Sequence, residues 1–429
     1  MKIAVVGSGI SGLTAAWRLA GDNEVHVYEA ADRLGGHTAT IDVQYRAEQL
    51  AIDTGFIVFN DWTYPNFIAL LNKLGVRSRP TTMSFSVSDA ASGVEYAGTN
   101  LNTLFAQRKN LLSPSFLRMV RDIQRFNSES EQHLLHYPEL ADITLGEYLR
   151  RFAYSDSFRD WYLLPMGAAI WSSNQRSMEA FPLQLFVRFF RNHGLLNLRN
   201  RPQWRVIEGG SRSYLEPLTA AYRDNIHLST PIKEVRRVHT SQGAQVCLTS
   251  KRGPEYFDEV IFACHSDQAL ALLGDATAAE KAVLAAIPYS HNEVVLHTDT
   301  TMLPRNQRCW ASWNVSLGRT PAELPALTYN MNILQGLQSE QTWCVTLNQT
   351  KLIKPECIVD VFHYEHPQFT LDGMRAQQRW HEINGVHHTW FCGAWWRNGF
   401  HEDGVWSAQL VVDALQARKR QRLALPLAG

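Results

Sequence analysis

The chain has 429 residues, 45% hydrophobic and 19% charged, so we expect it to bury a sizeable core and to divide into two or more domains. This composition excludes disordered and fibrous proteins. Lys plus Arg and Asp plus Glu each number 41, so no net charge favours nucleic acid or an acidic partner, and no nucleic-acid partner is expected.

The N-terminal residues predict a strand that runs straight into a glycine turn, which leaves no room for a signal peptide. We therefore expect a cytoplasmic protein. No apolar run reaches the roughly 18 residues of a membrane-spanning helix, so contact with the inner membrane face would be peripheral. The six cysteines are dispersed and include no C-x-x-C, which predicts reduced thiols. No metal site is expected.

The first elements predict one βαβ unit of a parallel sheet. A strand over 2–6 is followed by a glycine turn over 7–12, a helix over 13–20 and a strand over 24–29. Residues 64–193 are helical and irregular in pattern, with expected helices over 64–74, 114–135 and 144–152. This stretch looks inserted.

The remaining elements predict a return to the first sheet and a second, antiparallel sheet. After Gly209-Gly210 we expect a helix over 214–222 and strands over 226–228, 232–235 and 259–263. Runs at 294–297, 309–313 and 343–347 predict the antiparallel strands. A strand over 389–393 and a helix from Asp403 to about Leu415 end the ordered pattern, before a basic tail that we expect to fray.

The glycine turn carries the strongest motif of the chain. Gly7-x-Gly9-x-x-Gly12 follows a strand and opens a helix, and Glu29 ends the next strand, which is the context that a dinucleotide-binding fingerprint requires. Gly7 permits a tight turn, Gly9 lets the backbone approach a pyrophosphate, and Gly12 allows close packing of helix and strand. Glu29 would accept hydrogen bonds from a ribose. The motif alone does not choose between NAD and FAD.

Two further features favour FAD. Asp32-Arg33-Leu34-Gly35-Gly36-His37 forms a second glycine turn, and the strand that ends at Gly393 leads to the helix near Asp403. Here the chain resembles the flavin-containing amine oxidase superfamily, which includes monoamine oxidases, protoporphyrinogen oxidase and phytoene desaturases. Within it, the chain is similar to a bacterial branch of predicted NAD/FAD-binding proteins. The resemblance covers nearly the whole chain and is most specific at 3–60 and 389–415.

The resemblance implies a set of FAD contacts: Gly7, Gly9, Ser11, Gly12, Glu29, Arg33, Gly35, Gly36, His37, the backbone of Val235, Gly393, Asp403 and Val405. His37 stands where amine oxidases usually have Arg, and Trp395 replaces the acidic residue of a motif near their C-terminus. Both departures weaken the inference to amine chemistry. No counterpart of the cysteine that tethers the flavin of monoamine oxidases is visible, so we expect non-covalent FAD.

The predicted fold is α/β, with a discontinuous Rossmann-type FAD-binding domain and a substrate domain whose sheet is mainly antiparallel. The FAD-binding domain is expected to comprise 1–63, 203–270 and 385–420. Residues 64–202 form the expected helical insertion, and residues 271–384 the substrate domain.

The resemblance places two segments beside the flavin, Asp53 to Ile57 and Gly399 to Gly404. His401 or Glu402 could accept a proton there, or both could be polar caps at a helix start. The residues predicted to line the substrate pocket are Phe56, Ile57, Trp171, Tyr329 and Trp395, with ordinary core packing as the alternative. Reduced flavin would pass electrons to oxygen or a diffusible carrier, because the chain has no second fingerprint.

We expect an FAD-dependent oxidoreductase that takes a hydride from an apolar substrate, a membrane-lipid fatty acyl chain that becomes desaturated. Members of the branch occur beside cyclopropane-type fatty-acyl methyltransferases, which favours a lipid. Amine oxidation and non-redox isomerisation on a flavin remain alternatives. A non-catalytic escort protein for lipid-modified partners is disfavoured, because such proteins lose the pyrophosphate-binding glycines.

One local charge bias suggests a membrane contact. Between Arg188 and Arg205, arginines alternate with Phe189, Phe190 and Trp204. Arginine pairs with phosphate while aromatic neighbours enter an interface, which suits anionic phospholipid. A solvated helix face is the alternative.

Overall fold

The computed structural model describes residues 1–429 except 174, 198, 242, 318–325 and 425–429. Its first sheet is parallel and five-stranded, in the order β10-β2-β1-β14-β20. The strands are β1 (Lys2–Val6), β2 (Glu24–Tyr28), β10 (Ile226–His227), β14 (Glu259–Phe262) and β20 (Thr389–Phe391). Strand β14 is buried along its whole length, as in parallel sheets that are covered on both faces.

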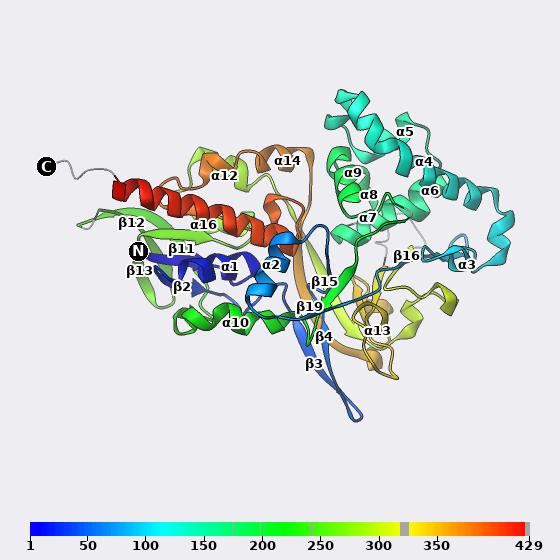
Figure 1. Cartoon of the computed structure of the whole chain (residues 1–429), viewed down its shortest axis with the longest axis horizontal. Coiled ribbons are helices and arrows are strands. Elements are labelled where there is room, and N and C mark those ends of the chain that lie inside the picture. Colours follow the sequence, from blue (N-terminus) through cyan, green and yellow to red (C-terminus); the bar gives the residue numbers. More distant parts are fainter. Residues whose placement is uncertain (174, 198, 242, 318–325, 425–429) are drawn as a thin grey trace.

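Helices cover one face of this sheet. Helix α1 (Ile10–Leu19) packs against the long C-terminal helix α16 (His401–Ala424), and Figure 1 shows the two side by side. Leu13, Ala16 and Val412 lie in their shared core. Helix α16 continues through the basic tail that was expected to fray.

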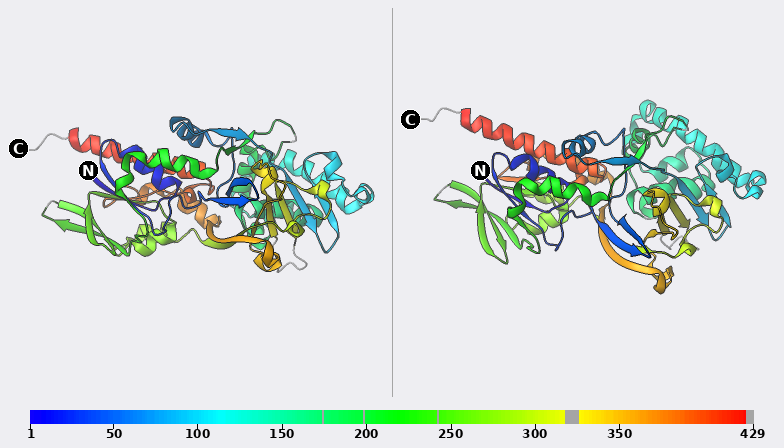
Figure 2. Two further views of the ribbon diagram at one scale, coloured as in Figure 1. Left: turned by 90° about the horizontal axis from the view of Figure 1, so that it is seen from below. Right: turned by 60° about the horizontal axis from the view of Figure 1, so that its bottom comes forward.

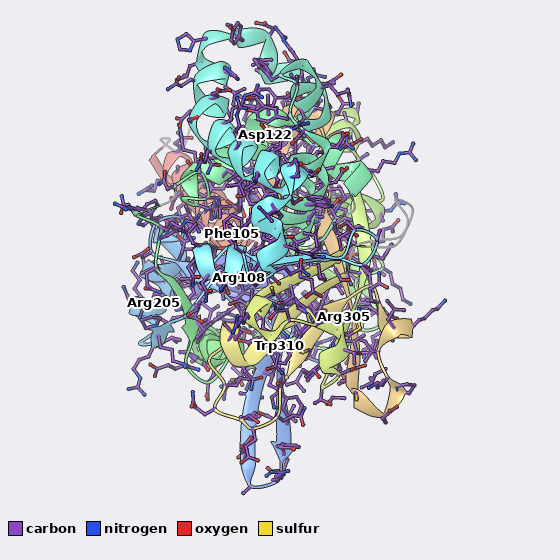
Figure 3. The ribbon with its side chains drawn as sticks, turned by 90° about the vertical axis from the view of Figure 1, so that its right-hand side faces the viewer. Phe105, Arg108, Asp122, Arg205, Arg305 and Trp310 are labelled. Carbon is purple, nitrogen blue, oxygen red and sulfur yellow. The ribbon has the colours of Figure 1, made fainter. Side chains whose placement is uncertain are left out.

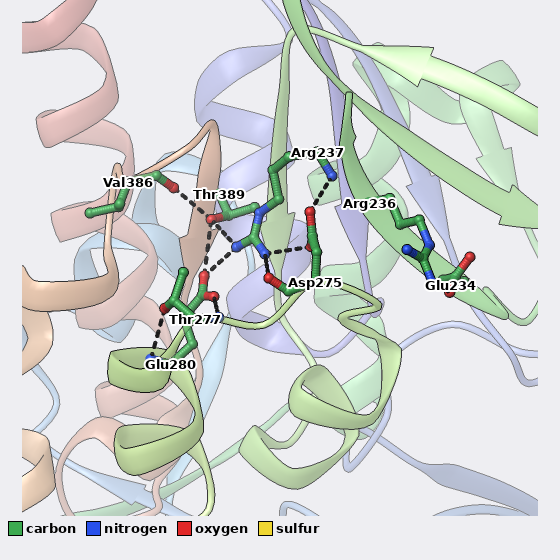
Figure 4. A network of polar contacts seen from close by, with 8 residues as sticks. All are labelled: Glu234, Arg236, Arg237, Asp275, Thr277, Glu280, Val386 and Thr389. Atoms are coloured by element: carbon green, nitrogen blue, oxygen red, sulfur yellow. Dashed lines mark hydrogen bonds and ion pairs between the residues drawn. The ribbon is translucent and has the colours of Figure 1, made fainter. Parts of the chain in front are cut away.

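The other face carries a three-stranded antiparallel sheet of β11 (Glu234–Thr240), β12 (Gly243–Ser250) and β13 (Gly253–Phe257). A polar network ties this sheet to the edge strand β20 (Figure 4). The Arg237 guanidinium donates to the Asp275 carboxylate at 2.7 Å and to the Thr389 hydroxyl at 3.0 Å, and it also pairs with Glu280. Because Glu280 is only 2% exposed, removal of Arg237 would leave a buried carboxylate without its cation.

The second sheet has seven strands in the order β19-β15-β18-β17-β16-β7-β8. They are β7 (Phe85–Asp89), β8 (Val94–Ala97), β15 (Tyr289–His297), β16 (Trp313–Leu317), β17 (Ala326–Asn330), β18 (Cys344–Leu347) and β19 (Ile358–Pro367). Strands β7 and β8 fall inside the expected helical insertion but pair into this sheet, with β7 parallel to β16. The predicted strand at 309–313 is wrong, because Gln307–Cys309 is a 3-10 turn and β16 begins at Trp313.

A helical layer covers the end of the molecule away from the first sheet (Figures 1 and 2). It contains α4 (Pro114–His136), α5 (Leu145–Arg151), α7 (Leu164–Trp171) and α9 (Leu183–Asn192), which share a core that includes Phe126, Phe158 and Phe186. The other helices are α2 (Pro65–Lys73), α3 (Leu101–Leu104), α6 (Asp156–Phe158), α8 (Gln175–Glu179), α10 (Leu215–Thr219), α11 (Ser266–Leu272), α12 (Ala278–Leu284), α13 (Met331–Leu334), α14 (Leu371–Gln377) and α15 (Trp380–Ile383). Short strands complete the chain: β3 (Thr40–Tyr45), β4 (Glu48–Asp53), β5 (Phe59–Asn60), β6 (Ser78–Pro80) and β9 (Trp204–Ile207).

None of the helices in the described part of the chain is both long and apolar enough to cross a membrane.

Candidate cofactor and substrate site

A cavity of about 1620 Å³ runs from the carboxyl ends of the first sheet's strands to the second sheet and the helical layer. Ligands of open α/β sheets bind at such strand ends. Because a pocket for one drug-sized ligand measures roughly 300–1,000 Å³, this cavity has space for a dinucleotide and a second molecule.

The glycine turn lies at the nucleotide end of the cavity. Gly7 has φ +107°, and a Cβ there would lie 2.8 Å from the Ala263 carbonyl oxygen. A Cβ on Gly12 would clash with the Gly7 carbonyl oxygen, so Gly12 permits close packing although it does not line the cavity. Gly9 differs, because a Cβ built on it meets no atom within 4 Å. The backbone is therefore open toward the cavity at Gly9.

Glu29 and Arg33 hold the two glycine turns in place. The Glu29 carboxylate accepts hydrogen bonds from the Ser8 N–H at 2.9 Å and from the Ala31 N–H at 2.9 Å. The Arg33 guanidinium donates to the carbonyl oxygens of Gly36 at 2.9 Å and Thr38 at 3.2 Å. Both residues line the cavity, as do Ser11, Gly35, Gly36 and Gly393.

Three other predicted FAD contacts do not line the cavity. Val235 is buried and its carbonyl oxygen accepts from the Gly274 N–H, and the cavity reaches Thr230, Pro231 and Ile232 instead. Val405 is also buried. The Asp403 carboxylate accepts from the backbone N–H groups of Asn398 and Phe400, and burial raises its pKa to about 6.

His37 lies in a group of histidines that sequence reasoning missed. Its ring centroid is 5.2 Å from those of Tyr364 and His366 and 6.3 Å from that of His265. Burial and the neighbouring His366 hold the pKa of His37 well below its usual value, so the ring stays neutral. Its Nε2 is buried with no hydrogen-bond partner within the described chain. The group combines residues of three separate segments, with His37 in the second glycine turn, His265 before α11 (Ser266–Leu272) and Tyr364 and His366 on β19, so no local motif signals it.

His401 lines the cavity but is held by neighbours. Its ring stacks on Phe56 with 3.6 Å between centroids, and its Nε2 lies 3.1 Å from the Tyr214 hydroxyl and 3.2 Å from the Thr38 hydroxyl. Burial lowers its pKa to about 3, which makes it a weak proton acceptor at neutral pH.

The structure does not bring Glu402 to the cavity. One of its carboxylate oxygens accepts from the Asn66 side chain at 2.6 Å and the other from the Phe67 N–H at 2.9 Å. These donors belong to the first turn of α2, whose N-terminus a carboxylate stabilises. This geometry supports the capping role for Glu402.

Glu402→Ala should therefore lower stability and leave the flavin chemistry unchanged. We expect a loss of about 1–3 kcal/mol, because two N–H donors of α2 lose a buried charged acceptor. Chemical denaturation and anaerobic flavin reduction measure the two effects. Glu402→Gln, which keeps one acceptor oxygen, should recover part of the stability. If the Glu402→Ala protein is stable but its flavin is reduced slowly, Glu402 has a catalytic role instead.

All five residues predicted for the substrate pocket line the cavity. Phe56, Ile57, Trp171 and Tyr329 belong to a group of apolar side chains that line the cavity, which we call the apolar wall. Other members of this apolar wall are Met83, Phe85, Tyr96, Tyr162, Met166, Ile170, Phe189, Leu195, Trp204, Trp313 and Leu334.

Trp395 occupies a different part of the cavity from the other four. Its indole N–H donates to the Cys264 carbonyl oxygen at 3.3 Å, at the strand ends of the first sheet, and its ring stacks on Trp396. This position suits a cofactor contact better than a substrate contact.

The structure corrects part of the membrane prediction for residues 188–205. Phe189 and Phe190 are 4% and 1% exposed, so these rings pack in the helical core and cannot enter an interface. Arg188, Arg191, Arg199 and Arg201 are exposed, and Arg201 also lines the cavity.

No group of three or more His, Cys, Asp or Glu side chains in the described ranges is arranged to hold a metal ion. The residues at the nucleotide end fit a dinucleotide instead, because Gly9 leaves open space beside the N-terminus of α1 and no side chain of the described chain caps that N-terminus.

The fold and this cavity define a dinucleotide-binding enzyme of the Rossmann type. The sequence profile of the flavin containing amine oxidoreductase family matches residues 10–325, and the chain belongs to that family. It is an FAD-dependent oxidoreductase. Among curated proteins, sequence comparison finds none that matches.

Solved structures share the fold at low identity. A protein described as a protoporphyrinogen oxidase from Exiguobacterium sp. 255-15 is 20% identical with a TM-score of 0.69, and the match covers 97% of this chain and 99% of that one. Cyclohexylamine oxidase from Brevibacterium oxydans IH-35A is 16% identical with a TM-score of 0.65 over 98% and 99%. A CLA-producing fatty acid isomerase from P. acnes is 13% identical with a TM-score of 0.67 over 97% and 98%.

FAD should be releasable from the protein. Cys264 is the cysteine that lines the described cavity, and burial raises its pKa to about 12, which makes it a poor nucleophile for a tether. Precipitation with acid should leave the yellow colour in the supernatant. Colour that stays in a washed, denatured pellet would show a covalent bond.

Proposed function

We propose that this chain takes a hydride from an apolar substrate, and that the substrate is a fatty acyl chain of a membrane lipid. The observation that carries the proposal is the apolar wall. It is built mainly from the helical layer and from the segments around β7, β8, β16 and β17, and the carboxylates that line the described cavity lie outside these segments. An ammonium group buried there would lose its hydration without gaining an anionic partner.

The carboxylates that line the described cavity lie elsewhere and are engaged. Glu29 holds the glycine turn, and Glu365 pairs with His265 at 3.1 Å and His291 at 2.7 Å. Glu293 accepts from the Thr350 hydroxyl. Because these carboxylates are engaged elsewhere, the apolar wall would hold a substrate through dispersion contacts and the exclusion of water.

Arg201 provides a candidate anchor for an anionic lipid head. It is exposed, lines the cavity, and uses its Nε–H for the Asn197 carbonyl oxygen at 2.7 Å. Its remaining N–H groups can pair with a carboxylate or phosphate. An acyl chain held by its head at Arg201 would lie against the aromatic side chains of the wall.

Desaturation removes two hydrogens from neighbouring carbons and leaves a double bond between them. FAD, when bound, accepts one hydrogen with its electron pair, and the other leaves as a proton to water or a base. A plain saturated chain has no group that lowers the C–H barrier, so we expect an activated position beside an alkene or branch. The chain's residues would align that carbon and exclude water.

Anaerobic mixing of the holoprotein with candidate substrates tests this function. Lipids with branched or unsaturated acyl chains should bleach the flavin and gain a double bond by mass spectrometry. NADH and NADPH should bleach it slowly, because the sequence has no second nucleotide fingerprint.

Amine oxidation is the second candidate, because aromatic side chains in the wall such as Tyr162, Trp171 and Tyr329 could hold a cation through their ring faces. Bleaching by amines alone would favour it. A shifted double bond without net reduction would favour isomerisation.

A further inference from the structure

Four leucines project from a short surface segment next to the helical layer. Leu101 is 75% exposed, Leu111 49%, Leu112 86% and Leu117 45%. They lie on α3, on the 3-10 helix Arg108–Leu112 and on the first turn of α4. Exposed apolar side chains that are concentrated in one short segment of the chain are candidates for an interaction surface.

The backbone beneath these leucines is ordered. The Asn100 side chain caps α3 at the Thr103 N–H, and the Ser113 hydroxyl caps α4 at the Phe116 N–H. Phe116 and Met119 are fully buried and anchor the segment from below. The leucines are therefore held outward by a fixed scaffold.

The same surface is basic. Residues 96–121 include no Asp or Glu, while they contain Arg108, Lys109, Arg118 and Arg121, all exposed. Arg305 and Arg308 are also exposed, and the turn that carries Arg308 contacts α3. None of these six cations forms an ion pair with an acidic side chain in the part of the chain that the structure describes.

The acidic residues that flank this segment, Glu95 and Asp122, accept hydrogen bonds from backbone N–H groups. Glu95 accepts from the backbone N–H groups of Arg305 and Asn306, and buried Asp122 accepts from the Ser155 N–H. Their charges therefore do not neutralise the basic residues through direct pairs. Figure 3 looks at this end of the molecule, with Phe105, Arg108, Arg305 and Trp310 labelled.

The segment that carries the leucines is continuous in the chain with residues that line the cavity. Gly98 and Thr99 line the cavity, and Leu101 follows two residues later. Tyr96, on the preceding strand β8, belongs to the apolar wall. An apolar molecule at the leucines would thus meet the chain segment that borders the substrate space.

We propose that Leu101, Leu111, Leu112 and Leu117, together with these six cations, dock the protein on a bilayer that contains anionic phospholipid. Leucines that enter the acyl region and arginines that meet phosphate are the combination that holds a protein on such a surface. Delivery of an acyl substrate to the cavity from this position rests on the proposed function, whereas docking does not.

Vesicle flotation with the holoprotein tests docking without turnover. Vesicles of phosphatidylcholine with phosphatidylglycerol should carry the protein at low salt, and phosphatidylcholine alone should carry much less. The double variant Leu101→Gln/Leu112→Gln should lower the partition coefficient about tenfold or more. Arg118→Gln/Arg121→Gln should lower it about fivefold per charge, with the difference shrinking at high salt.

Leu135→Gln is the matched control. Leu135 is also 75% exposed but lies at the other end of α4, about 30 Å away at 1.5 Å per residue. The Leu135→Gln variant should bind the vesicles as the unaltered protein does. The proposal would be overturned if the leucine and arginine variants floated with the vesicles as well as the Leu135→Gln control does. It would also be overturned if the protein formed a concentration-dependent dimer that Leu112→Gln abolishes. Acyl substrates in detergent micelles that still bleach the flavin would show that the proposed function stands even if docking fails.

Discussion

Gly9→Ala is expected to weaken FAD binding and to leave the apoprotein as stable as before. Gly9 has φ −67°, which alanine adopts without strain, and the added methyl group would meet no protein atom within 4 Å. It would instead occupy space beside the N-terminus of α1, where the pyrophosphate is expected. Overpacking of about 1–3 kcal/mol corresponds to a loss of affinity of roughly 5- to 150-fold.

Fluorescence titration of the apoprotein with FAD measures this effect, and its thermal unfolding checks the fold. Gly21→Ala is the matched control, because a methyl group there also meets nothing within 4 Å but lies away from the cavity. Unchanged FAD affinity in Gly9→Ala would place the pyrophosphate elsewhere.

The second large effect is a loss of stability in mild acid. Burial lowers the pKa of His193 and of His297 to about 4 and that of His401 to about 3. The unfolded chain binds these protons near pH 6.5, whereas the folded protein does not until the pH falls to the lowered values. Stability is therefore lost as the pH falls from about 6.5 to 4, by about 2 kcal/mol per histidine between pH 7 and 5.

Two buried carboxyls oppose this loss. Burial raises the pKa of Asp53 and of Asp403 to about 6, so the folded protein takes up their protons before the unfolded chain does. Each returns about 1 kcal/mol between pH 7 and 5, so the two carboxyls offset only part of the loss that the histidines cause.

Urea unfolding of the holoprotein at pH 7 and at pH 5 measures the difference. His297 provides the sharpest variant, because its Nδ1 accepts from the Asp299 N–H and its Nε2 bonds the Thr346 hydroxyl, which requires the neutral ring. His297→Gln should remove about 2 kcal/mol of the pH dependence. A pH dependence identical to that of the unaltered protein would contradict this account.

The nucleotide end could be predicted from sequence because its signals are local. The strand, glycine turn and helix that follow Lys2 lie within 20 residues, and Glu29 follows at the end of the next strand. Long α4 was likewise visible from its apolar periodicity, and its observed bounds differ from the prediction by one residue.

The cavity walls could not be predicted in the same way. Strand β7 is five residues long and finds its partner β16 more than 220 residues later. His37 meets His366 only through the pairing of β15 with β19 and the packing of that pair against the second glycine turn. In α9, Phe186, Phe189 and Phe190 are buried together on one face of the helix, at positions i, i+3 and i+4, so an arginine-rich pattern concealed a core element.

The strand order of the first sheet sets when the cofactor can be loaded during synthesis. Strand β1 pairs with β14, which emerges more than 250 residues later, and β14 then pairs with β20 at Thr389–Phe391. Helix α16, which packs on α1 beside the glycine turn, follows β20 in the chain. A nascent chain with its complete glycine fingerprint thus lacks an edge strand and a covering helix of its nucleotide site until the core residues of α16, from Val405 to Leu415, have been synthesised. We therefore expect FAD to bind late in synthesis. A stop codon shortly before β20 would abolish FAD binding although every residue of the glycine fingerprint is present.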